Sequence, residues 1–238
     1  MDTKVFDRIE KKYLIDAAQK KHLLMLLKTK MKKDKYFHSE IFNLYFDTEK
    51  YDLIIKSIEN PDFKEKLRAR SYGGYDKVFM EIKTKMKGAE NRVGHKRRFL
   101  ITHHDFQKLV RGEKRAVELA SLKIEEGTDL QIAKEVDYLL DYFALKPRIL
   151  VYYDRESYIS DDGLRITFDE NLKYRDKDLN FIQKVRDKRY FDDNKIIMEV
   201  KANGVMPLWL VKKLSEEKIF PSRFSKIGKI YEKIRKEQ

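Results

Sequence analysis

The sequence predicts an α+β protein in which a mainly antiparallel β-sheet closes into a barrel, forming a tunnel with a basic interior and helices around it. Three observations predict this fold. Short turns join strand-like segments, and helical segments interrupt them. Charged and apolar residues alternate along six of the strand-like segments, and cations dominate their charged faces. We expect one domain, residues 1–238, because no Pro- or Gly-rich linker or internal repeat divides the chain.

The composition is that of a folded and strongly basic chain. Hydrophobic residues make up 42% and aromatic residues 12%, which excludes a disordered chain. The net charge of +13 indicates a polyanionic partner: nucleic acid, an anionic membrane surface or a phosphate-rich molecule. The absence of cysteine excludes disulfides, thiolate zinc sites and cysteine nucleophiles. With no signal-peptide pattern and no run of 18 apolar residues, the sequence predicts a cytoplasmic location without a membrane span.

The first strands and the first helix are predicted from the spacing of apolar residues and from capping and turn residues. Residues 7–15 alternate as a strand, and 17–31 have helical periodicity with Asp16 as N-cap. Residues 43–48 are expected to form a strand that leads into a turn. Two strands, 66–72 and 78–85, flank Gly73-Gly74-Tyr75-Asp76, a hairpin signal.

The remaining elements are assigned in the same way. A strand over 95–102 precedes two helices, and Asp161-Asp162-Gly163 is the turn between two later strands. One more strand and two helices complete the chain. The expected helices are 103–111, 129–143, 207–217 and 225–236, and the expected strands are 148–159, 164–172 and 196–202.

The alternation has an unusual charge bias. Along 66–72, Lys66, Arg68 and Arg70 share one face, and Leu67 and Ala69 share the other. Five further strand segments repeat the pattern, and we add Arg155 and Lys226 to the set. The positions of the cations are 8, 12, 66, 68, 70, 83, 96, 98, 155, 165, 201 and 226, and those of the anions are 10, 81, 169 and 199.

The simplest interpretation of such strands is a sheet with one solvated face. A solvated face ordinarily mixes the two signs of charge, because like charges opposite one another repel. A closed sheet would instead place the cations inside, where an anion must accompany them. A chain of phosphates fits this description, since arginine forks and lysine point charges bind phosphate oxygens. The minority glutamates suit Mg²⁺ or Mn²⁺, which take oxygen ligands. Duplex DNA would not fit inside.

Ten short segments carry a resemblance that covers about residues 6 to 235. In chain order they resemble the VTC domain, the catalytic polyphosphate-polymerase domain of the vacuolar transporter chaperone complex, in the triphosphate tunnel metalloenzyme superfamily. The segments are IEKKY (9–13), LYFDT (44–48), LRARSYG (67–73), EIKTK (81–85), KRRF (96–99), YYDRESY (152–158), LRITFD (164–169), MEVK (198–201), PLWL (207–210) and SRFSKIG (222–228).

The resemblance implies an ATP:polyphosphate phosphotransferase. Such an enzyme transfers the γ-phosphate of ATP onto a growing polyphosphate chain, releases ADP and uses Mn²⁺ or Mg²⁺. ATP and inorganic polyphosphate would be its partners, and no nucleic acid is expected. Transfer is mainly positioning and charge stabilisation, so no histidine or cysteine nucleophile is required.

Site residues follow by motif from the resemblance. The catalytic set is Arg68, Arg70, Lys83, Arg155, Arg165 and Lys226. Phosphate binding is assigned to Lys12, Lys96, Arg98, Tyr153, Lys201 and Ser225. Metal binding is assigned to Glu199, with Glu10 and Glu81 as further candidates.

The sequence departs from the family pattern in ways that limit which family properties can be expected of this chain. Arg223 stands where a lysine is expected, which keeps the charge. No SPX-like sensor domain is seen before residue 6 and no membrane anchor after 235. We therefore expect inositol-phosphate control and coupled translocation to lie outside this chain, and the sequence does not decide whether a membrane partner receives the product.

Two alternative functions stay open. The same superfamily includes inorganic triphosphatases and adenylate cyclases, which carry Glu-x-Glu-x-Lys in the first strand. The corresponding residues here are Arg8-Ile9-Glu10-Lys11-Lys12, and arginine in place of the first glutamate favours the polymerase. A non-enzymatic module that binds polyanions is the second alternative, although no RNP-like motif, helix-turn-helix signal or basic tail supports it.

Overall fold

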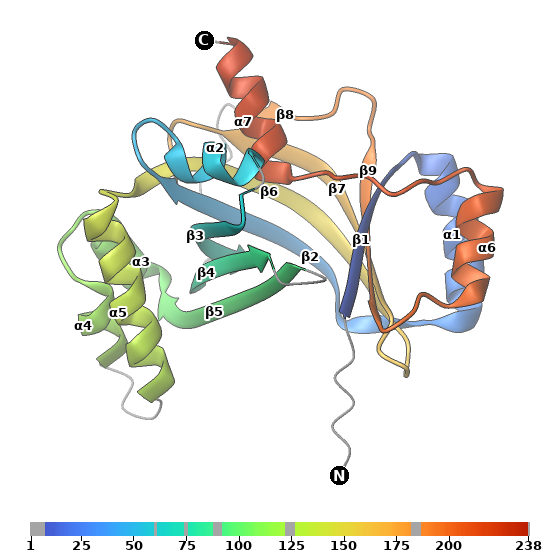
Figure 1. The fold of residues 1–238 in the computed structure, drawn as a ribbon, viewed down its shortest axis with the longest axis horizontal. Coiled ribbons are helices and arrows are strands. Elements are labelled where there is room, and N and C mark those ends of the chain that lie inside the picture. Colours follow the sequence, from blue (N-terminus) through green and yellow to red (C-terminus); the bar gives the residue numbers. More distant parts are fainter. Residues whose placement is uncertain are drawn as a thin grey trace. The chain divides into compact units, whose positions relative to one another are not determined.

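The structure, a computed structural model, describes residues 8–59, 61–73, 76–87, 92–121, 127–181 and 187–237. It confirms the α+β class, with antiparallel strands and interspersed helices (Figure 1). The strands are β1 (Arg8–Ile15), β2 (Lys32–Asp47), β3 (Phe63–Tyr72), β4 (Lys77–Lys87), β5 (Arg92–Thr102), β6 (Lys146–Ile159), β7 (Arg165–Arg175), β8 (Lys188–Arg189) and β9 (Ile196–Asn203). The helices are α1 (Ala17–Lys30), α2 (Asp52–Ile58), α3 (His103–Val110), α4 (Ala116–Ser121), α5 (Gly127–Tyr142), α6 (Leu208–Glu216) and α7 (Lys226–Glu237).

The predicted closed barrel is wrong. The strands follow the order β1-β9-β7-β6-β2-β3-β4-β5, with β8 paired to β7. β1 and β5 are the two ends of this order, and no ladder joins them in the part of the chain that the structure describes. Alternation of charged and apolar residues gives a sheet two different faces whether it is open or closed. The pattern therefore predicted the faces and could not predict closure, which depends on pairing between the terminal strands.

Helix α2 and helix α4 were not predicted, and β2 begins eleven residues before the predicted strand over 43–48. Helix α2 begins at Asp52, five residues after Asp47, the last residue of β2. The buried Asp47 carboxylate accepts hydrogen bonds from the backbone N–H groups of Thr48, Leu53 and Ile54, at 2.8 to 2.9 Å. A buried carboxylate with three donors satisfies the first N–H groups of a short helix, a contact that no periodicity shows. Asp7, Gly74 and Tyr75 of the predicted elements lie outside the described residues.

The chain divides into two compact units, which are described separately. Unit 1 comprises residues 1–40, 153–172 and 189–225. Its β1 and β7 both pair antiparallel with β9, and helices α1 and α6 cover one face of these strands (Figure 1). That face carries the apolar residues, among them Tyr13, Met198 and Val200, which pack with Leu23 and Leu210 of the two helices.

Helix α1 begins at the predicted N-cap. Asp16 and Gln19 form a capping box: the Asp16 carboxylate accepts from the Gln19 N–H at 2.8 Å, and the Gln19 side chain accepts from the Asp16 N–H at 3.1 Å. Gln19 also donates to the carbonyl oxygen of Glu217, just beyond α6. This contact ties the two helices together over the unit 1 core.

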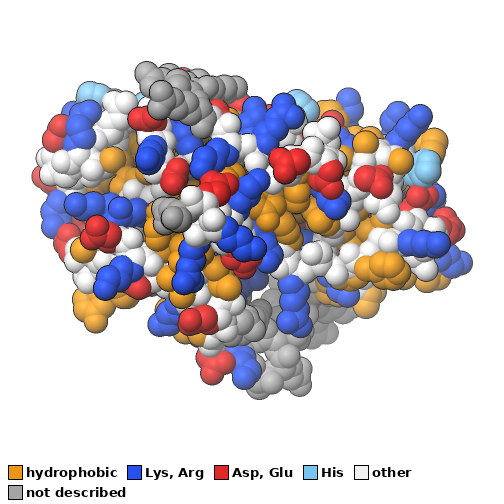
Figure 2. Space-filling model, turned by 90° about the horizontal axis from the view of Figure 1, so that it is seen from above, with side chains coloured by type: hydrophobic (Ala, Val, Ile, Leu, Met, Phe, Trp, Pro, Cys, Tyr) orange, Lys and Arg blue, Asp and Glu red, His pale blue; other side chains and the backbone are white. Residues whose placement is uncertain are grey.

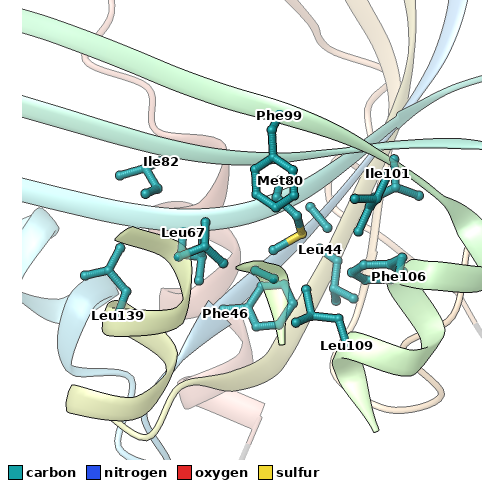
Figure 3. Packing of buried hydrophobic residues seen from close by; sticks show 14 of the residues in the cluster. Leu44, Phe46, Leu67, Met80, Ile82, Phe99, Ile101, Phe106, Leu109 and Leu139 are labelled. Carbon is teal, nitrogen blue, oxygen red and sulfur yellow. The ribbon is translucent and has the colours of Figure 1, made fainter. Parts of the chain in front are cut away.

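Unit 2 comprises residues 41–152, 173–188 and 226–238. In it, β2, β3, β4 and β5 pair antiparallel in chain order, and β3 and β4 form the predicted hairpin. Helices α3, α4 and α5 pack on one face. Figure 3 shows Leu67, Met80 and Phe99 of the strands among Leu109 and Leu139 of the helices. The predicted apolar faces are thus the buried ones. None of the helices in the described ranges is long and apolar enough to cross a membrane.

Candidate functional site

Surface charge alone does not locate a site. Figure 2 shows lysine and arginine side chains spread over the visible face, with aspartate and glutamate between them. The strand faces opposite the two cores are more informative, because strand register places their charged side chains next to one another. Each unit has one such charged face.

The unit 2 charged face is built from two rows of residues across β3, β4 and β5. Arg68 lies opposite Glu81, and Glu81 lies opposite Arg98. In the neighbouring row, Lys66 lies opposite Lys83, and Lys83 lies opposite Lys96. Arg70 on β3 completes the face. We call Arg68, Glu81 and Arg98 the arginine row, and Lys66, Lys83 and Lys96 the lysine row.

Glu81 gathers four cations around one buried carboxylate. Its side chain is 0% exposed, and its Oε2 accepts from Nε and Nη2 of Arg68 at 2.8 and 2.6 Å. Nε of Arg70 is 4.0 Å from the same oxygen. Oε1 lies 3.7 Å from Nη1 of Arg98 and 3.9 Å from Nζ of Lys96. One negative charge faces four positive charges, so the cluster keeps a net positive charge.

The pKa of Glu81 shows the strength of this field. Burial alone would raise the pKa, because it disfavours the charged form. The charges of Arg68, Arg70 and Lys96 and the hydrogen bond from Arg68 outweigh burial and hold the pKa of Glu81 below its ordinary value. Burial lowers the pKa of Lys96, and the charges of Arg98 and Arg70 lower it further against the opposing effect of Glu81.

Two β2 residues that sequence reasoning missed hold the arginines in place. The buried Asn43 accepts a 2.8 Å hydrogen bond from Nε of Arg70, and its amide nitrogen donates to the carbonyl of Val151 at 3.3 Å. The Tyr45 hydroxyl accepts from Nη1 of Arg68 at 3.4 Å. Period-two alternation in the segment 43–47 would have placed both side chains on the charged face.

The tyrosines on this face also respond to the cations. Tyr45 is buried, and burial alone would raise its pKa. The charges of Arg68 and Lys66 instead lower the pKa of Tyr45 from 10.0 to about 8. The pKa of Tyr72 is lowered as well, because Arg70 outweighs the effect of burial. The unit 2 charged face is therefore arranged to stabilise added negative charge.

The unit 1 charged face pairs its cations with acids. Nε and Nη2 of Arg155 donate to the two carboxylate oxygens of Asp169 at 2.5 and 2.7 Å, and Asp169 is fully buried. Nη2 of Arg155 also lies 3.8 Å from Oε2 of Glu199. The Tyr153 ring lies against the Arg155 guanidinium, at 5.4 Å from the ring centroid.

Charges alternate across β1 and β9. Glu10 lies opposite Lys201, and Lys12 lies opposite Glu199. Nζ of Lys201 is 3.9 Å from Glu10 and 3.7 Å from Glu199. Burial would raise the pKa of Glu199, but a hydrogen bond with Glu10 and the charges of Lys201, Lys12 and Arg155 lower it far below its ordinary value. Nζ of Lys12 donates to the carbonyl of Phe224 at 3.3 Å.

Arg165 belongs to a third polar group. Sequence reasoning named Arg165 but missed its partners, Asp34 and Ser157. Its Nη2 lies 3.0 Å from Oδ2 of Asp34, and its Nε donates to the Ser157 hydroxyl at 3.1 Å. That hydroxyl donates to Asp34 at 3.0 Å. The last two predicted residues lie at the start of α7: Lys226 is its first residue and Ser225 precedes it.

The acids of unit 1 fit a hard divalent cation. Glu10 and Glu199 lie on either side of Lys201, whose Nζ is 3.9 Å from Glu10 and 3.7 Å from Glu199. Thr167, opposite Glu199, has a buried hydroxyl oxygen without a hydrogen-bond partner in the structure. Mg²⁺ and Mn²⁺ accept one or two carboxylates plus phosphate and water oxygens, so this donor set suits them. No group of three or more His, Asp or Glu side chains suitable for a metal occurs among the described residues, so phosphate and water would have to complete the shell.

The fold and the two charged faces define an α+β protein with phosphate-compatible cations on an open antiparallel sheet. A model of the VTC domain family matches residues 7–234. The chain therefore belongs to the VTC domain family, as the ordered motifs predicted.

Known relatives agree with this assignment. Vacuolar transporter chaperone complex subunit 4 of Schizosaccharomyces pombe is 27% identical over 165 residues, which cover 64% of this chain and 23% of that protein. The subunit 4 protein of Trypanosoma brucei brucei is 27% identical over 155 residues, covering 57% of this chain and 20% of that protein. The chain thus spans less than a quarter of either relative. A putative adenylyl cyclase from Hippeastrum, described as having a dominant triphosphatase activity, has a similar fold, with a TM-score of 0.52, 17% identity and 92% coverage of both chains.

Proposed function

We propose that this chain is a polyphosphate polymerase. It transfers the γ-phosphate of ATP onto the end of an inorganic polyphosphate chain and releases ADP, with Mn²⁺ or Mg²⁺ as cofactor. The names of the two subunit 4 relatives support a role in the same kind of complex. The observation that carries the proposal is the Glu81 cluster, in which four cations share one buried carboxylate.

The arrangement of that cluster suits phosphoryl transfer. Catalysis of this reaction consists mainly of positioning the phosphates and stabilising charge on the transferred group. Hydrogen bonds from Arg68 to Glu81 and from Arg70 to Asn43 fix the guanidinium groups before substrate arrives. Fixed donors stabilise a developing charge without the cost of reorienting in the reaction. Bidentate arginines therefore bind the reacting phosphates, and no side-chain nucleophile is needed.

The other predicted residues are proposed to bind the metal or to contact phosphates. The attacking oxygen belongs to the terminal phosphate of the acceptor, which is ionised at neutral pH, so no strong base is required. When bound, the divalent cation neutralises phosphate charge, and Glu10 and Glu199 are the residues proposed to hold it. Phosphate contacts are proposed for Lys12, Lys83, Lys96, Arg98, Tyr153, Arg155, Arg165, Lys201, Ser225 and Lys226.

A direct assay tests the proposal. Purified protein is incubated with ATP and Mn²⁺, with and without pyrophosphate as primer, and the products are separated on a polyphosphate gel while ADP is measured. The proposal predicts a ladder of long chains with matching ADP release. Orthophosphate release without a ladder would replace it with a triphosphatase, and binding of polyphosphate without turnover would leave a binding module.

A further inference from the structure

Helix α1 is strongly basic, whereas helix α5 of unit 2 is acidic. The α1 sequence, AAQKKHLLMLLKTK, contains four lysines and no acidic residue. The α5 sequence, GTDLQIAKEVDYLLDY, contains four acidic residues and one lysine. The lysines of α1 continue beyond its end as KKDK at the start of β2. Lys28, Lys30, Lys33 and Lys35 are exposed, and none of the four forms an ion pair with another described residue.

Exposed apolar side chains lie at the same end of unit 1. Met25 of α1 is 58% exposed, and Leu208, the first residue of α6, is 66% exposed. Val205, just before α6, is 83% exposed. The two helices lie side by side and run antiparallel (Figure 1), and the start of α1 contacts the end of α6 through the hydrogen bond from Gln19 to Glu217. The lysine-rich end of α1 therefore lies beside the start of α6.

These side chains face away from the core. Leu23 and Leu27 of α1 and Leu210 of α6 are buried in the unit 1 core. Met25 and Lys28 are three positions apart, so they are neighbours on the exposed side of α1. Both helices cover the same face of the strands, and their exposed sides therefore form one outer surface. We call Met25, Val205, Leu208 and the four exposed lysines the basic end of unit 1.

The acids close to these lysines already have cations of their own. Asp161, on the turn between β6 and β7, pairs with Lys32 at 3.0 Å. Asp34 pairs with Arg165, also at 3.0 Å. The basic end of unit 1 thus combines surplus positive charge with exposed apolar surface.

This combination matches the surface of an anionic membrane. Negatively charged headgroups attract lysines, and apolar side chains enter the boundary between headgroups and acyl chains. A nucleic acid or a free polyphosphate would contact the lysines and leave the apolar side chains exposed. The four cations are all lysines, which are hydrated point charges on flexible stems. Such groups suit a layer of moving headgroups better than one fixed phosphate.

We infer that the basic end of unit 1 binds the surface of a membrane that contains anionic lipids. Helices α1 and α6 lie along the surface, with Met25, Val205 and Leu208 at the level of the headgroups. The charged face of unit 1 is on the other side of the same strands and stays open to substrate. The inference goes beyond the proposed function and does not depend on it.

Co-sedimentation of the purified full chain with lipid vesicles tests the inference. One set of vesicles is phosphatidylcholine alone, and the other contains about one-third phosphatidylglycerol, an anionic lipid. Two double variants separate the contributions of charge and apolar surface. Lys28→Gln/Lys35→Gln removes two lysines, and Met25→Gln/Leu208→Gln removes two apolar side chains.

Each variant has a matched control in unit 2. Lys134→Gln/Lys146→Gln removes two exposed lysines, and Tyr138→Gln/Tyr142→Gln removes two exposed aromatic side chains from α5. All of these positions are exposed, so the melting temperatures of the four variants should be close to that of the wild type. The assay contains no ATP, so its result is independent of polymerase activity.

The wild type should bind the anionic vesicles at least about tenfold more tightly than the neutral ones. Each lysine near an anionic surface strengthens binding by about fivefold, so the charge variant should bind at least about tenfold more weakly. The apolar variant should bind about fivefold more weakly or worse, and each control should change the affinity by less than about twofold.

Three results would overturn the inference. The first is no binding of the wild type to anionic vesicles, and the second is an equal loss in a variant and its control. The third is unchanged vesicle binding by Met25→Gln/Leu208→Gln, which would assign the lysines to a free polyanion such as nucleic acid.

Discussion

The charged face of unit 2 and the charged face of unit 1 contain similar residues in opposite balance. In unit 2, a single carboxylate, Glu81, faces four cations. In unit 1, Arg155 has Asp169, Lys201 lies between Glu10 and Glu199, and Arg165 has Asp34. A face with matched charges is already neutralised, whereas a face with surplus cations stabilises an anion. The comparison places surplus positive charge on the unit 2 face, and paired charges with metal-compatible acids on the unit 1 face.

The largest expected effect is on the stability of unit 1. Asp169→Asn leaves the buried Arg155 without its bidentate partner, and breaking a buried pair in this way costs roughly 3–5 kcal/mol. Asp161→Asn is the control: it breaks an exposed pair with Lys32, expected to be worth less than about 1 kcal/mol. Urea unfolding measures both. Equal small losses would show that the pairs of unit 1 are not its stabilising feature.

The next effect is on catalysis by unit 2. Arg70→Ala should lower turnover by roughly a hundredfold or more, because one fixed donor to the transferred group is lost. Folding should be retained, since the hydrogen bond between Arg70 and Asn43 is only partly buried and neither residue belongs to the unit 2 hydrophobic core. Arg111→Ala removes an arginine whose partner is Glu113 on the surface and should leave ADP release unchanged. A fully active Arg70→Ala enzyme would show that the unit 2 charged face takes no part in the reaction.

A smaller effect concerns the metal. Glu199→Gln removes one of two adjacent carboxylates and should raise the Mn²⁺ concentration for half-maximal activity about tenfold or more. Glu216→Gln, on the exposed side of α6, is the control in the same unit. An activity titration with Mn²⁺ compares the two. Identical metal requirements would withdraw the metal role from Glu199.

The smallest effect is a titration within unit 2. The pKa of Tyr45 is lowered to about 8, so the phenol ionises in the folded protein before it would in the unfolded chain. A lowered pKa contributes stability that is fully present above the unfolded value near 10 and is lost as pH falls through about 8. Relative to Tyr45→Phe, the wild type should therefore gain stability between pH 8 and 10. Near-ultraviolet absorbance follows the ionisation.

Adding tripolyphosphate gives a second test based on the pKa of Tyr45. Tripolyphosphate should raise the pKa of Tyr45, because its negative charge offsets the field of Arg68 and Lys66. Phosphate bound elsewhere would leave the Tyr45 titration where it was.

Local pattern predicted much of this architecture. Period-two alternation placed Arg68, Arg70 and Glu199 on charged faces and Leu67 and Met198 in the cores, because strand geometry determines both. Asp16 and the hairpin between β3 and β4 were equally local signals.

Contacts between residues distant in sequence could not be predicted from local patterns. The open sheet depends on which strands pair at its ends, and no local pattern carries that information. Asp34 supports Arg165 from 131 positions away in the chain, and Asn43 supports Arg70 across a strand pair. The sequence therefore showed which residues carry charge, and the structure showed which acids hold which cations.

The most direct test of the central claim is the affinity for tripolyphosphate, measured at one ionic strength. It is compared among the wild type, Arg70→Ala and the surface control Lys134→Gln. The account predicts tight binding by the wild type and the control, and at least about tenfold weaker binding by Arg70→Ala, because a fork on the cation-rich face is lost. Equal affinity in all three proteins would contradict phosphate capture by the unit 2 charged face.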